Sequence, residues 1–346
     1  MNKLLLIGNY TFTGESKGIY TIRMDMETGS LAIVDVCTDC ENPSFLAQQG
    51  DAVFAVHELM DRGCIASYRV DAQGKLEHKH RQDMPGGLMC HLNLWPGGRY
   101  LTATNYWTGS MLVCPISDDG IVGAPISINQ YSGKSINPQR QEGPHTHSTA
   151  IDPSEKWLVC AELGIDQIFI YEFDKESGAL LNTAPVSSVK APAGAGPRHF
   201  TFHPDGTKLY VSAELSNEVL VYDFEPQTGN LSWMQKLSTL PVNFTQENLA
   251  ADIHCDSNGK YLYVSNRGHE SIAVFCIQHD GTLVSAGHRS CLGSGPRSFT
   301  LLDGWMLIAN QGSGSVSVCK VDENGMPGEK VAEVSIPQAS HILPLK

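Results

Sequence analysis

The sequence predicts an all-β protein, namely a seven-bladed β-propeller made of four-stranded antiparallel blades. The first observation is a glycine-centred hairpin turn that recurs seven times in 346 residues, at spacings of 44 to 58 residues. The second is a set of short apolar runs, such as KYLYVSN and SIAVFCI, whose β-branched and aromatic residues are typical of strands. The third is that no stretch longer than about ten residues keeps the 3.6-residue period of a helix. A unit of about 49 residues lies in the range of propeller blades.

The recurrent turn consists of an acidic or polar residue, a glycine, and an apolar residue within two positions. Asp-Gly and Asn-Gly between apolar runs are strong hairpin signals, because glycine adopts the positive φ that tight hairpin turns require. A second hairpin turn, as in PDGTKLY and SNGKYLY, precedes a further strand of the unit. Two hairpins per unit predict four antiparallel strands per blade. The seven glycines are Gly29, Gly74, Gly120, Gly178, Gly229, Gly281 and Gly325.

The two ends of the chain are expected to share one blade. Residues 3–36 supply only three strands, KLLLIGN, GIYTIRM and LAIVDVC. The C-terminal segment PQASHILPL resembles the first-strand segments GPRHFTF and GPRSFTLL of other units. We therefore expect residues 337–345 to be the innermost strand of the first blade, which removes exposed strand edges. Residues 1–346 are accordingly expected to form a single propeller domain.

The overall charge limits the class of partner. The net charge is −13, which disfavours binding to phosphate backbones and anionic lipid, so we expect neither nucleic acid nor membrane as a partner. The N-terminal region has only four consecutive apolar residues, fewer than a secretory signal or a membrane span needs. No glycine-rich phosphate loop or dinucleotide fingerprint is present, so no cofactor is expected. We expect a monomer or a weak homo-oligomer.

Cysteine usage indicates a reducing compartment. Ten cysteines are scattered along the chain, and several lie inside apolar runs where a thiol packs as a small hydrophobe. The one close pair, Cys37 and Cys40, has no second pair beside it and no βαβ context. We therefore interpret it as neither a zinc site nor a redox site. These features predict a cytoplasmic protein.

Polar and charged residues are expected to gather at one mouth of the central channel. The innermost strand of a blade lines the channel and the second strand returns antiparallel to it. The start of the first and the end of the second therefore lie at the same mouth. The starts of innermost strands offer His145, His147, Arg198, His199 and Arg297. The ends of second strands offer Asn9, His57, Glu58, Asn105, Glu162, Glu214, Asn266, Arg267 and Asn310.

These residues are not all expected to be functional. Asparagine commonly ends a strand, so we interpret the lone asparagines as structural. The arginines, histidines and glutamates near a channel need partners or a ligand. One segment, roughly residues 124–144, lengthens the repeat and is expected to project from the same mouth. It adds Arg140, Gln141 and Glu142 to the candidate site.

Three kinds of chemistry compete for this cluster. His145 and His147 have the spacing of two metal ligands on one strand face, but neighbouring arginines would repel a divalent cation, so no metal site is expected. The cluster could instead be a binding surface for an acidic peptide. In the third interpretation, arginines hold an anionic substrate while a carboxylate and an imidazole handle protons, as general acid–base hydrolysis requires. No serine or cysteine nucleophile motif is present.

Four segments resemble a known family. They are RQEGPHTHS (140–148), GPRHFTFHPDGTKLYVSAEL (196–215), the block 252–275 and GPRSF (295–299). Together they are similar to the lactonase family of seven-bladed propellers, which includes bacterial 6-phosphogluconolactonases and eukaryotic 3-carboxy-cis,cis-muconate lactonizing enzymes. The resemblance covers essentially the whole chain. It implies that four residues are catalytic: His147, Arg198, Glu214 and Arg267. The other candidates are expected to bind substrate: Arg140, His145, His199, Asn266 and Arg297.

The resemblance implies an activity on a small anionic lactone. The first expectation is a carboxylic ester hydrolase that converts 6-phospho-glucono-1,5-lactone to 6-phosphogluconate in the oxidative pentose phosphate pathway. The alternatives are cycloisomerisation of a carboxymuconate and a non-enzymatic interaction propeller. In the hydrolysis, Arg198 and Arg267 would stabilise the oxyanion. Whether Glu214 or His147 is the general base stays open at this stage.

Overall fold

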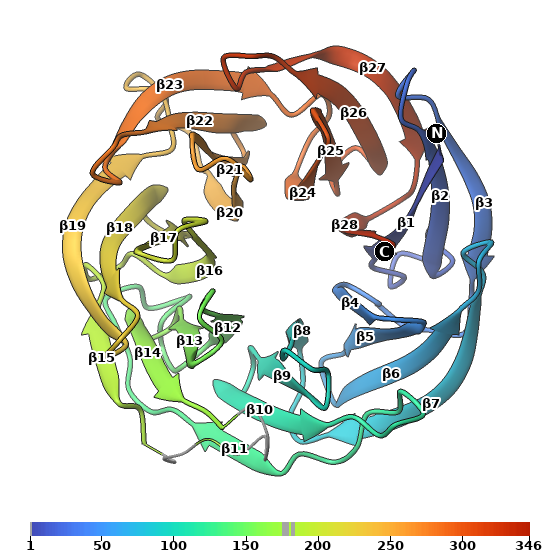
Figure 1. The fold of residues 1–346 in the computed structure, drawn as a ribbon, viewed down its shortest axis with the longest axis horizontal. Helices are drawn as coiled ribbons and strands as arrows, with labels where there is room; N and C mark the ends of the chain where they lie inside the picture. The colour runs from blue at the N-terminus through green and yellow to red at the C-terminus, as the bar shows by residue number, and fades with distance from the viewer. Residues whose placement is uncertain (1, 175–179, 181–183) are drawn as a thin grey trace.

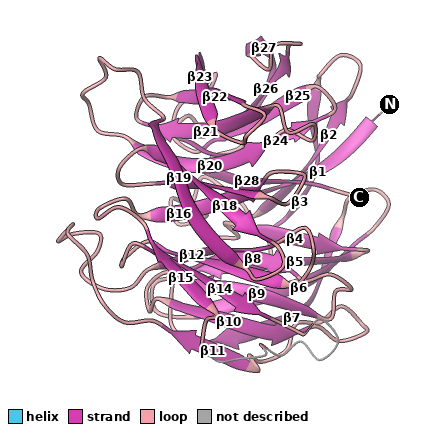
Figure 2. Cartoon of the chain, turned by 60° about the vertical axis from the view of Figure 1, so that its left-hand side comes forward, coloured by secondary structure: helices cyan, strands magenta, loops and turns pink. Residues whose placement is uncertain are grey.

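The described chain is a ring of seven antiparallel sheets. The computed structural model describes residues 2–174, 180 and 184–346, and these residues form strands, turns and loops without a helix. Each sheet has four strands, and the seven sheets surround a central channel (Figure 1). Strands and connecting loops are also all that a second view of the described residues shows (Figure 2). The predicted all-β, seven-bladed propeller is confirmed.

The strands are numbered in chain order. Blade 1 contains β28, β1, β2 and β3, and blades 2 to 7 each contain four consecutive strands from β4 onward. The bounds are β1 Asn2–Asn9, β2 Ile19–Asp25, β3 Leu31–Cys37, β4 Leu46–Gln49, β5 Ala52–Glu58, β6 Gly63–Val70, β7 Leu76–Met84, β8 Met89–Leu94, β9 Tyr100–Asn105, β10 Ser110–Pro115, β11 Ser127–Gln130, β12 Thr146–Ile151, β13 Trp157–Glu162, β14 Gln167–Glu172, β15 Ser187–Lys190, β16 Pro197–Phe202, β17 Lys208–Ala213, β18 Glu218–Glu225, β19 Asn230–Ser238, β20 Leu249–Cys255, β21 Tyr261–Arg267, β22 Ser271–Ile277, β23 Leu283–Ser290, β24 Pro296–Leu302, β25 Trp305–Asn310, β26 Ser315–Val321, β27 Pro327–Ser335 and β28 Ala339–Pro344.

The ring is closed by the C-terminal strand, as the sequence predicts. β28 pairs antiparallel with β1, with Ile7 opposite Ile342 and Leu5 opposite Pro344. Figure 1 shows the red C-terminal strand beside the blue N-terminal strand at the inner edge of blade 1. Because β28 occupies the innermost position, the inner edge of β1 is paired and blade 1 has four strands like the others.

The recurrent glycines mark the outer hairpins of the blades. Six of the seven lie among the described residues, and each has a φ between 72° and 84°; Gly178 lies outside them. They also allow close packing between blades: a Cβ on Gly29 would lie 2.7 Å from the Trp305 ring, and one on Gly325 would lie 2.5 Å from Tyr261. Glycine is therefore required twice over, for the turn and for the contact with the neighbouring blade.

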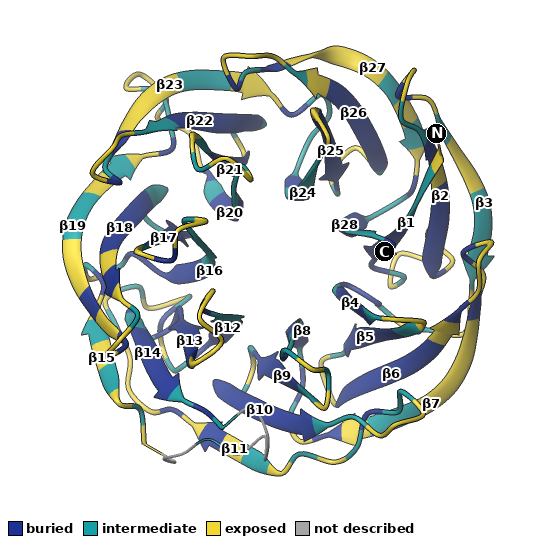
Figure 3. Cartoon of the chain, in the orientation of Figure 1, coloured by how far each residue is buried: buried dark blue, intermediate teal, exposed yellow. Residues whose placement is uncertain are grey.

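The hydrophobic core is divided among the blade interfaces. Seven clusters of buried apolar residues are found among the described residues, and each joins two neighbouring blades. One cluster, for example, packs Leu5 and Ile22 of blade 1 against Leu307 and Val318 of blade 7. The middle strands are mostly buried, whereas the outermost strands alternate between exposed and covered residues (Figure 3). The packing makes a rigid ring that can hold side chains from different blades at fixed positions.

A β-bulge recurs at the start of the innermost strands. In five blades the register shifts by one residue there, and each bulge leaves one residue without a cross-strand partner. A bulge re-aims the side chain of its extra residue. The residues passed over by the pairing are Cys90, His147, Arg198, Arg297 and Ser340.

The long insertion is shorter than the sequence indicates. Part of residues 124–144 is the regular outer strand β11, which pairs with β10. The remaining loop, residues 131–145, runs from the outer edge of blade 3 back to the start of β12 and carries Arg140. The strand β11 is short and lacks an apolar alternation, so the sequence does not reveal it.

Candidate active site

Two backbone positions in each blade supply the side chains of the mouth. One is the bulged residue of the innermost strand, and the other is the residue at or just after the end of the second strand. In blade 5 these are Arg198 and Glu214, and the Glu214 amide donates to the Gly196 carbonyl at 2.8 Å. This backbone hydrogen bond continues the ladder past the bulge, so both side chains are set by regular sheet geometry.

Glu214 lies at the centre of an arginine cluster. Its Oε1 is 2.5 Å from Arg140 Nη2, and its Oε2 is 2.8 Å from Arg198 Nε and 2.9 Å from Arg267 Nη2. The side chains of Glu214 and Arg198 are only 4% and 3% exposed. The three arginines come from the loop after blade 3, from β16 and from β21, so this contact assembles parts of three blades around one carboxylate.

The cluster around Glu214 contains more positive than negative charge. Burial by itself would raise the pKa of Glu214, but Arg267, Arg198 and Arg140 together hold it well below its usual range. Burial lowers the pKa of Arg267 to about 10, so its guanidinium stays charged at neutral pH. Three guanidiniums therefore face one carboxylate, and the site keeps a surplus of positive charge inside a chain whose net charge is −13.

Several donors of the cluster are not satisfied by the protein. Among the described residues, Arg198 Nη1, Arg267 Nε and His147 Nδ1 are buried and have no hydrogen-bond partner. Buried polar atoms normally have one, and leaving a charged donor unpaired is costly. Unsatisfied donors from three different blades converge on the same mouth, which indicates a place for a ligand with acceptor atoms.

The loop that carries Arg140 is fastened to the ring. Gln141 Nε2 donates to the Leu163 carbonyl at 2.9 Å and to Asp166 Oδ1 at 2.8 Å. Arg140 Nη2 also donates to the Tyr106 hydroxyl at 3.2 Å. The position of Arg140 over Glu214 is thus fixed by the loop's own hydrogen bonds as well as by the ion pair.

His145 is held by contacts within the protein, and the expectation that it binds substrate stays a prediction. Its ring stacks on Tyr106 with the ring centroids 4.4 Å apart, Nδ1 lies 2.9 Å from the Tyr106 carbonyl oxygen, and Nε2 lies 3.1 Å from Glu142 Oε1. Both nitrogens are therefore occupied. His147, two residues later, lies edge-on to the same Tyr106 ring. Burial and the nearby Arg198 hold the pKa of His147 well below its usual range, so it is a neutral imidazole at pH 7.

The opposite side of the mouth carries a second carboxylate. Glu58 Oε2 accepts hydrogen bonds from the Tyr10 hydroxyl at 2.7 Å and from Ser44 Oγ at 2.6 Å. Arg297 lies over the Tyr10 ring, 5.1 Å from its centroid, and makes no ion pair within the described part of the chain. A small cavity joins the two sides, and its lining includes Glu58, Arg198, His199 and Arg297.

Asn266 does not line the mouth cavity, and the expectation that it binds substrate stays a prediction. It is fully buried, and its Nδ2 donates to the Thr239 carbonyl at 2.7 Å. Asn105 behaves in the same way, because its Nδ2 donates to the Pro85 carbonyl at 2.9 Å. Asn310 Nδ2 likewise donates to the Cys291 carbonyl, in the connection from blade 6 to blade 7. These strand-end asparagines close turns, as the sequence indicates for the lone ones.

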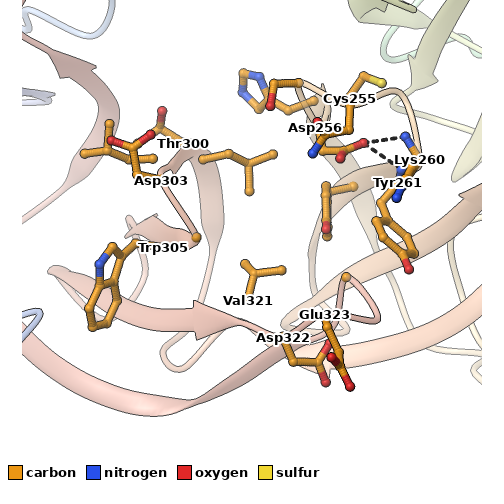
Figure 4. Close-up of a pocket in the computed structure, with 18 residues that line it drawn as sticks. Cys255, Asp256, Lys260, Tyr261, Thr300, Asp303, Trp305, Val321, Asp322 and Glu323 are labelled. Atoms are coloured by element: carbon orange, nitrogen blue, oxygen red, sulfur yellow. Dashed lines mark hydrogen bonds between the residues drawn. The ribbon is translucent and has the colours of Figure 1, made fainter. Parts of the chain in front are cut away.

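A hollow much larger than the mouth cavity lies away from this cluster. It is a cleft between blades 6 and 7, with Trp305 and Tyr261 on facing sides (Figure 4). Its carboxylates belong to turns: Asp256 Oδ1 accepts from the backbone amides of Lys260 and Tyr261, both at 2.7 Å. Asp322 Oδ1 accepts from the Met326 amide at 2.8 Å. These groups are satisfied locally, so the cleft lacks the convergent, unsatisfied donors of the mouth.

The described residues contain no group of three or more His, Cys, Asp or Glu side chains that could hold a metal ion. They also contain no helix long and apolar enough to cross a membrane. The positive charge of the mouth is therefore supplied by guanidinium groups, which are permanently charged and suited to bidentate contacts with carboxylates and phosphates.

Fold and site together define a seven-bladed propeller with an arginine-rich mouth built around a buried carboxylate. Comparison with known proteins gives the family. The chain belongs to the lactonase family of 7-bladed β-propellers, whose model matches residues 4–344. The family expectation drawn from four sequence segments is thus confirmed.

Named relatives and solved structures cover nearly the whole chain. It is 32% identical over 338 residues to a 6-phosphogluconolactonase of Bacillus subtilis strain 168, spanning 96% of this chain and 95% of the relative. A 6-phosphogluconolactonase of Pectobacterium carotovorum is 33% identical over 278 residues, or 79% of each chain. The structure of a periplasmic gluconolactonase from Pseudomonas aeruginosa is similar with a TM-score of 0.93, 30% identity and coverage of 100% of this chain and 99% of that one.

Sequence reasoning missed four residues that shape the mouth. Tyr10 and Tyr106 hold Glu58 and Arg140, Ser44 bonds Glu58, and Asp252 bonds His199. A signal was present for the tyrosines, because each directly follows a strand-end asparagine, in Asn9-Tyr10 and Asn105-Tyr106. Arg267 follows Asn266 in the same way, so the residue after the asparagine is the one that faces the mouth.

Proposed function

We propose that this protein hydrolyses 6-phospho-glucono-1,5-lactone to 6-phosphogluconate, a reaction of the oxidative pentose phosphate pathway. Two relatives at 32% and 33% identity are 6-phosphogluconolactonases, and a structural relative is a gluconolactonase. These names agree with the lactone hydrolase, a carboxylic ester hydrolase, that the sequence leads us to expect.

The surplus of guanidinium groups at the mouth is the observation that carries the proposal. A lactone with a phosphate group is an anion, and its hydrolysis passes through a tetrahedral oxyanion. Arg198, Arg267 and Arg140 cannot all be neutralised by Glu214. The site therefore favours both the charged substrate and the charge that develops in the transition state.

Each arginine has a role that follows from its position. Arg198 and Arg267 have unsatisfied nitrogens beside Glu214, so we assign them to the carbonyl oxygen that becomes the oxyanion. Arg297 lies across the mouth on the Tyr10 ring without an ion pair among the described residues, so we assign it to the phosphate. Arg140 is about two-thirds covered and closes the site from the loop side.

Glu214 is a poor general base in this arrangement. A base must accept a proton, and three arginines stabilise the ionised carboxylate so that its pKa lies well below the usual range. Its stronger contribution is to hold the guanidiniums in one geometry. Of the two bases that the sequence left open, Glu214 and His147, the imidazole is the better acceptor, because burial keeps it neutral.

We further propose that the protein acts in the cytoplasm on a small anionic sugar-phosphate lactone, as a monomer or a weak homo-oligomer. All ten cysteines of the chain lie among the described residues as free thiols, which suits a reducing compartment. Cell fractionation tests the compartment, and size-exclusion chromatography with light scattering tests the oligomeric state.

The direct test of the activity is an assay on freshly generated 6-phosphogluconolactone. The lactone also opens spontaneously, so each rate is corrected by a reaction without protein and by one with the Glu214→Gln variant. The expected result is rapid opening by the native protein and slow opening in both controls. A native rate equal to the spontaneous rate would refute the proposal, and turnover of 3-carboxy-cis,cis-muconate instead would identify the cycloisomerase.

A further inference from the structure

We propose that His199, oriented by Asp252, is the residue that accepts the proton of the attacking water. The inference rests on the proposed lactone hydrolysis and names a base that neither the sequence nor the family comparison singles out. His199 follows Arg198 directly on β16, and its side chain lines both the mouth cavity and a channel cavity of about 140 Å³ beneath it. The His199 side chain therefore lies between the two cavities.

Asp252 fixes the orientation of the His199 ring. Its Oδ1 lies 3.0 Å from His199 Nδ1, and the carboxylate comes from the adjacent blade on β20. Asp252 is 6% exposed, and its Oδ2 also accepts hydrogen bonds from His254 Nε2 at 3.1 Å and from the Phe299 amide at 3.2 Å. The Ile253 amide also donates to Oδ1 at 3.1 Å, and a carboxylate held by four donors cannot easily turn, so the imidazole that it bonds is held as well.

The same contact sets which nitrogen carries the proton. Burial would raise the pKa of Asp252, but the His254 and His199 imidazoles keep it well below its usual range, so the group is ionised and accepts only. His199 Nδ1 must then be the donor. The lone pair is left on Nε2, for which the described residues provide no hydrogen-bond partner. This is the arrangement of an oriented histidine base with a carboxylate behind it.

Other candidate bases have less suitable surroundings. The mouth cavity is lined by His199 but not by His147 or Glu214. Glu214 is engaged by three arginines. Glu58 lines the cavity, but its Oε2 already accepts two hydroxyl hydrogen bonds. His199 lines the cavity and has Nδ1 held by Asp252, while its Nε2 has no hydrogen-bond partner among the described residues.

The proposed step balances without any further reactant. A water oxygen attacks the lactone carbonyl carbon, the new C–O bond forms, and the water proton moves to His199 Nε2. The carbonyl π electrons become an oxyanion, held by Arg198 and Arg267. Collapse of the oxyanion breaks the ring C–O bond, and the departing alkoxide takes the proton back from His199. The product is the open hydroxy acid, whose carboxyl group then ionises.

The neighbours of His199 keep its imidazole neutral at pH 7. Burial and the adjacent Arg198 lower its pKa to about 4, whereas Asp252 acts in the opposite direction, so the ring is neutral at pH 7. The ionisable groups that face it are Arg198 on its own strand, His91 on β8, His147 on β12, and Asp252 and His254 on β20. An oxyanion bound to the guanidiniums would offset their positive charge, so the pKa of His199 would rise during the reaction.

The first experiment replaces the proposed base. His199→Ala should lower kcat by about 10²–10⁴, the usual range for one acid–base group, with little change in KM. Added imidazole should restore part of the kcat of this variant, because it can occupy the vacated space and accept the proton. His199→Gln keeps much of the size and polarity, guards against a folding defect, and should be as slow as the alanine variant but without rescue.

The second experiment tests the positioning residue. Asp252→Asn should lower kcat by about 10²-fold with KM unchanged and without rescue by imidazole, because the ring is present but no longer fixed as the Nδ1–H tautomer. A matched control is His341→Gln. His341 lines the same channel cavity from β28 but has no carboxylate partner among the described residues, and its loss should leave kcat within about twofold.

The outcomes separate this inference from the proposed function. If the native protein opens the lactone but folded His199→Ala and His199→Gln keep near-native kcat, His199 is not the base while the hydrolysis stands. Rescue by imidazole in Asp252→Asn, or a rise in KM alone, would likewise overturn the assignment. If the native protein does not open the lactone, the proposed function itself fails and the variant comparison loses its premise.

Discussion

Glu214 and Glu58 occupy the same backbone position on opposite sides of the mouth. The Glu214 amide donates at 2.8 Å to the Gly196 carbonyl, two residues before Arg198. The Glu58 amide donates at 3.1 Å to the Asn42 carbonyl, two residues before Ser44. Their side chains have different neighbours. Glu214 is surrounded by three guanidiniums, whereas Glu58 is bonded by the hydroxyls of Tyr10 and Ser44.

The difference shows how a repeated scaffold acquires one specialised site. The propeller repeats the backbone position in every blade, and the chemistry depends on what the neighbouring blades and loops direct toward it. Glu214 holds several guanidiniums in fixed positions, whereas Glu58 accepts hydrogen bonds from neutral hydroxyls. The mouth is therefore polarised, with the oxyanion side at Glu214 and the side near Arg297 left for the phosphate.

Among the variants that test this comparison, the largest effect is expected from Glu214→Gln. Without the carboxylate the three guanidiniums repel one another, and kcat/KM should fall by about 10²–10³, as for loss of an oxyanion-hole donor. Removing one partner of a buried ion pair also costs about 3–5 kcal/mol, so the melting temperature should fall. Steady-state kinetics and thermal denaturation measure both. Near-native activity in a folded variant would show that the arginine cluster is not the site.

A smaller and more selective effect is expected from Arg297→Gln. A hydrogen bond to a charged group contributes about 1.5–3 kcal/mol, so KM for the phosphorylated lactone should rise about 10- to 100-fold. The KM for unphosphorylated gluconolactone should change much less. Arg289→Gln, an exposed arginine on the outer strand β23, is the matched control. An equal change for both lactones would mean that Arg297 does not contact the phosphate.

Glu58→Gln should have a weaker effect than Glu214→Gln. The amide oxygen can still accept from Tyr10 and Ser44, and only the charge near Arg297 is lost. We expect kcat/KM to fall by about tenfold or less, which corresponds to about 1.4 kcal/mol. Kinetics of both glutamine variants under the same conditions give the comparison. Equal losses would show that the two carboxylates share one role.

The smallest effect on activity is expected from Asn105→Ala. Its Nδ2 donates to the Pro85 carbonyl, in the connection from blade 2 to blade 3, and its Oδ1 accepts from the Thr108 amide of blade 3 at 3.0 Å. Activity should stay within about twofold, while the free energy of unfolding falls by about 1–3 kcal/mol because buried polar groups lose their partner. Chemical denaturation measures the second quantity. A large loss of activity at native stability would place Asn105 in the site.

The blade count was predictable because it depends on local chemistry. Glycine at positive φ is a property of single residues, and Gly29, Gly74 and Gly281 mark their hairpins whatever surrounds them. Strand composition and the matching chain ends add the four-stranded blades and the closing strand. All of these signals lie in short stretches of sequence, so they can be recognised without knowledge of distant contacts.

The candidate site was predictable only in part. Arg198, Glu214 and Arg267 were found because they lie at strand ends, and propeller geometry brings strand ends together. The hydrogen bond of Asn266 was not predictable, because its acceptor, the Thr239 carbonyl, lies in the connection from the preceding blade. The stacking of His145 was not predictable, because its partner, Tyr106, lies in another blade. Such contacts depend on the bulges and the loop path, for which sequence spacing has no signal.

The closing strand β28 also bears on when the protein becomes active during its synthesis. Chains emerge from the ribosome N-terminus first, and β28 is the last strand to appear. Until it pairs with β1, the inner edge of blade 1 is open, and the cluster between blades 7 and 1 lacks Ile342. Arg297, on blade 7, then has no fixed Tyr10 ring to lie on. The mouth is therefore assembled only after β28 has paired with β1.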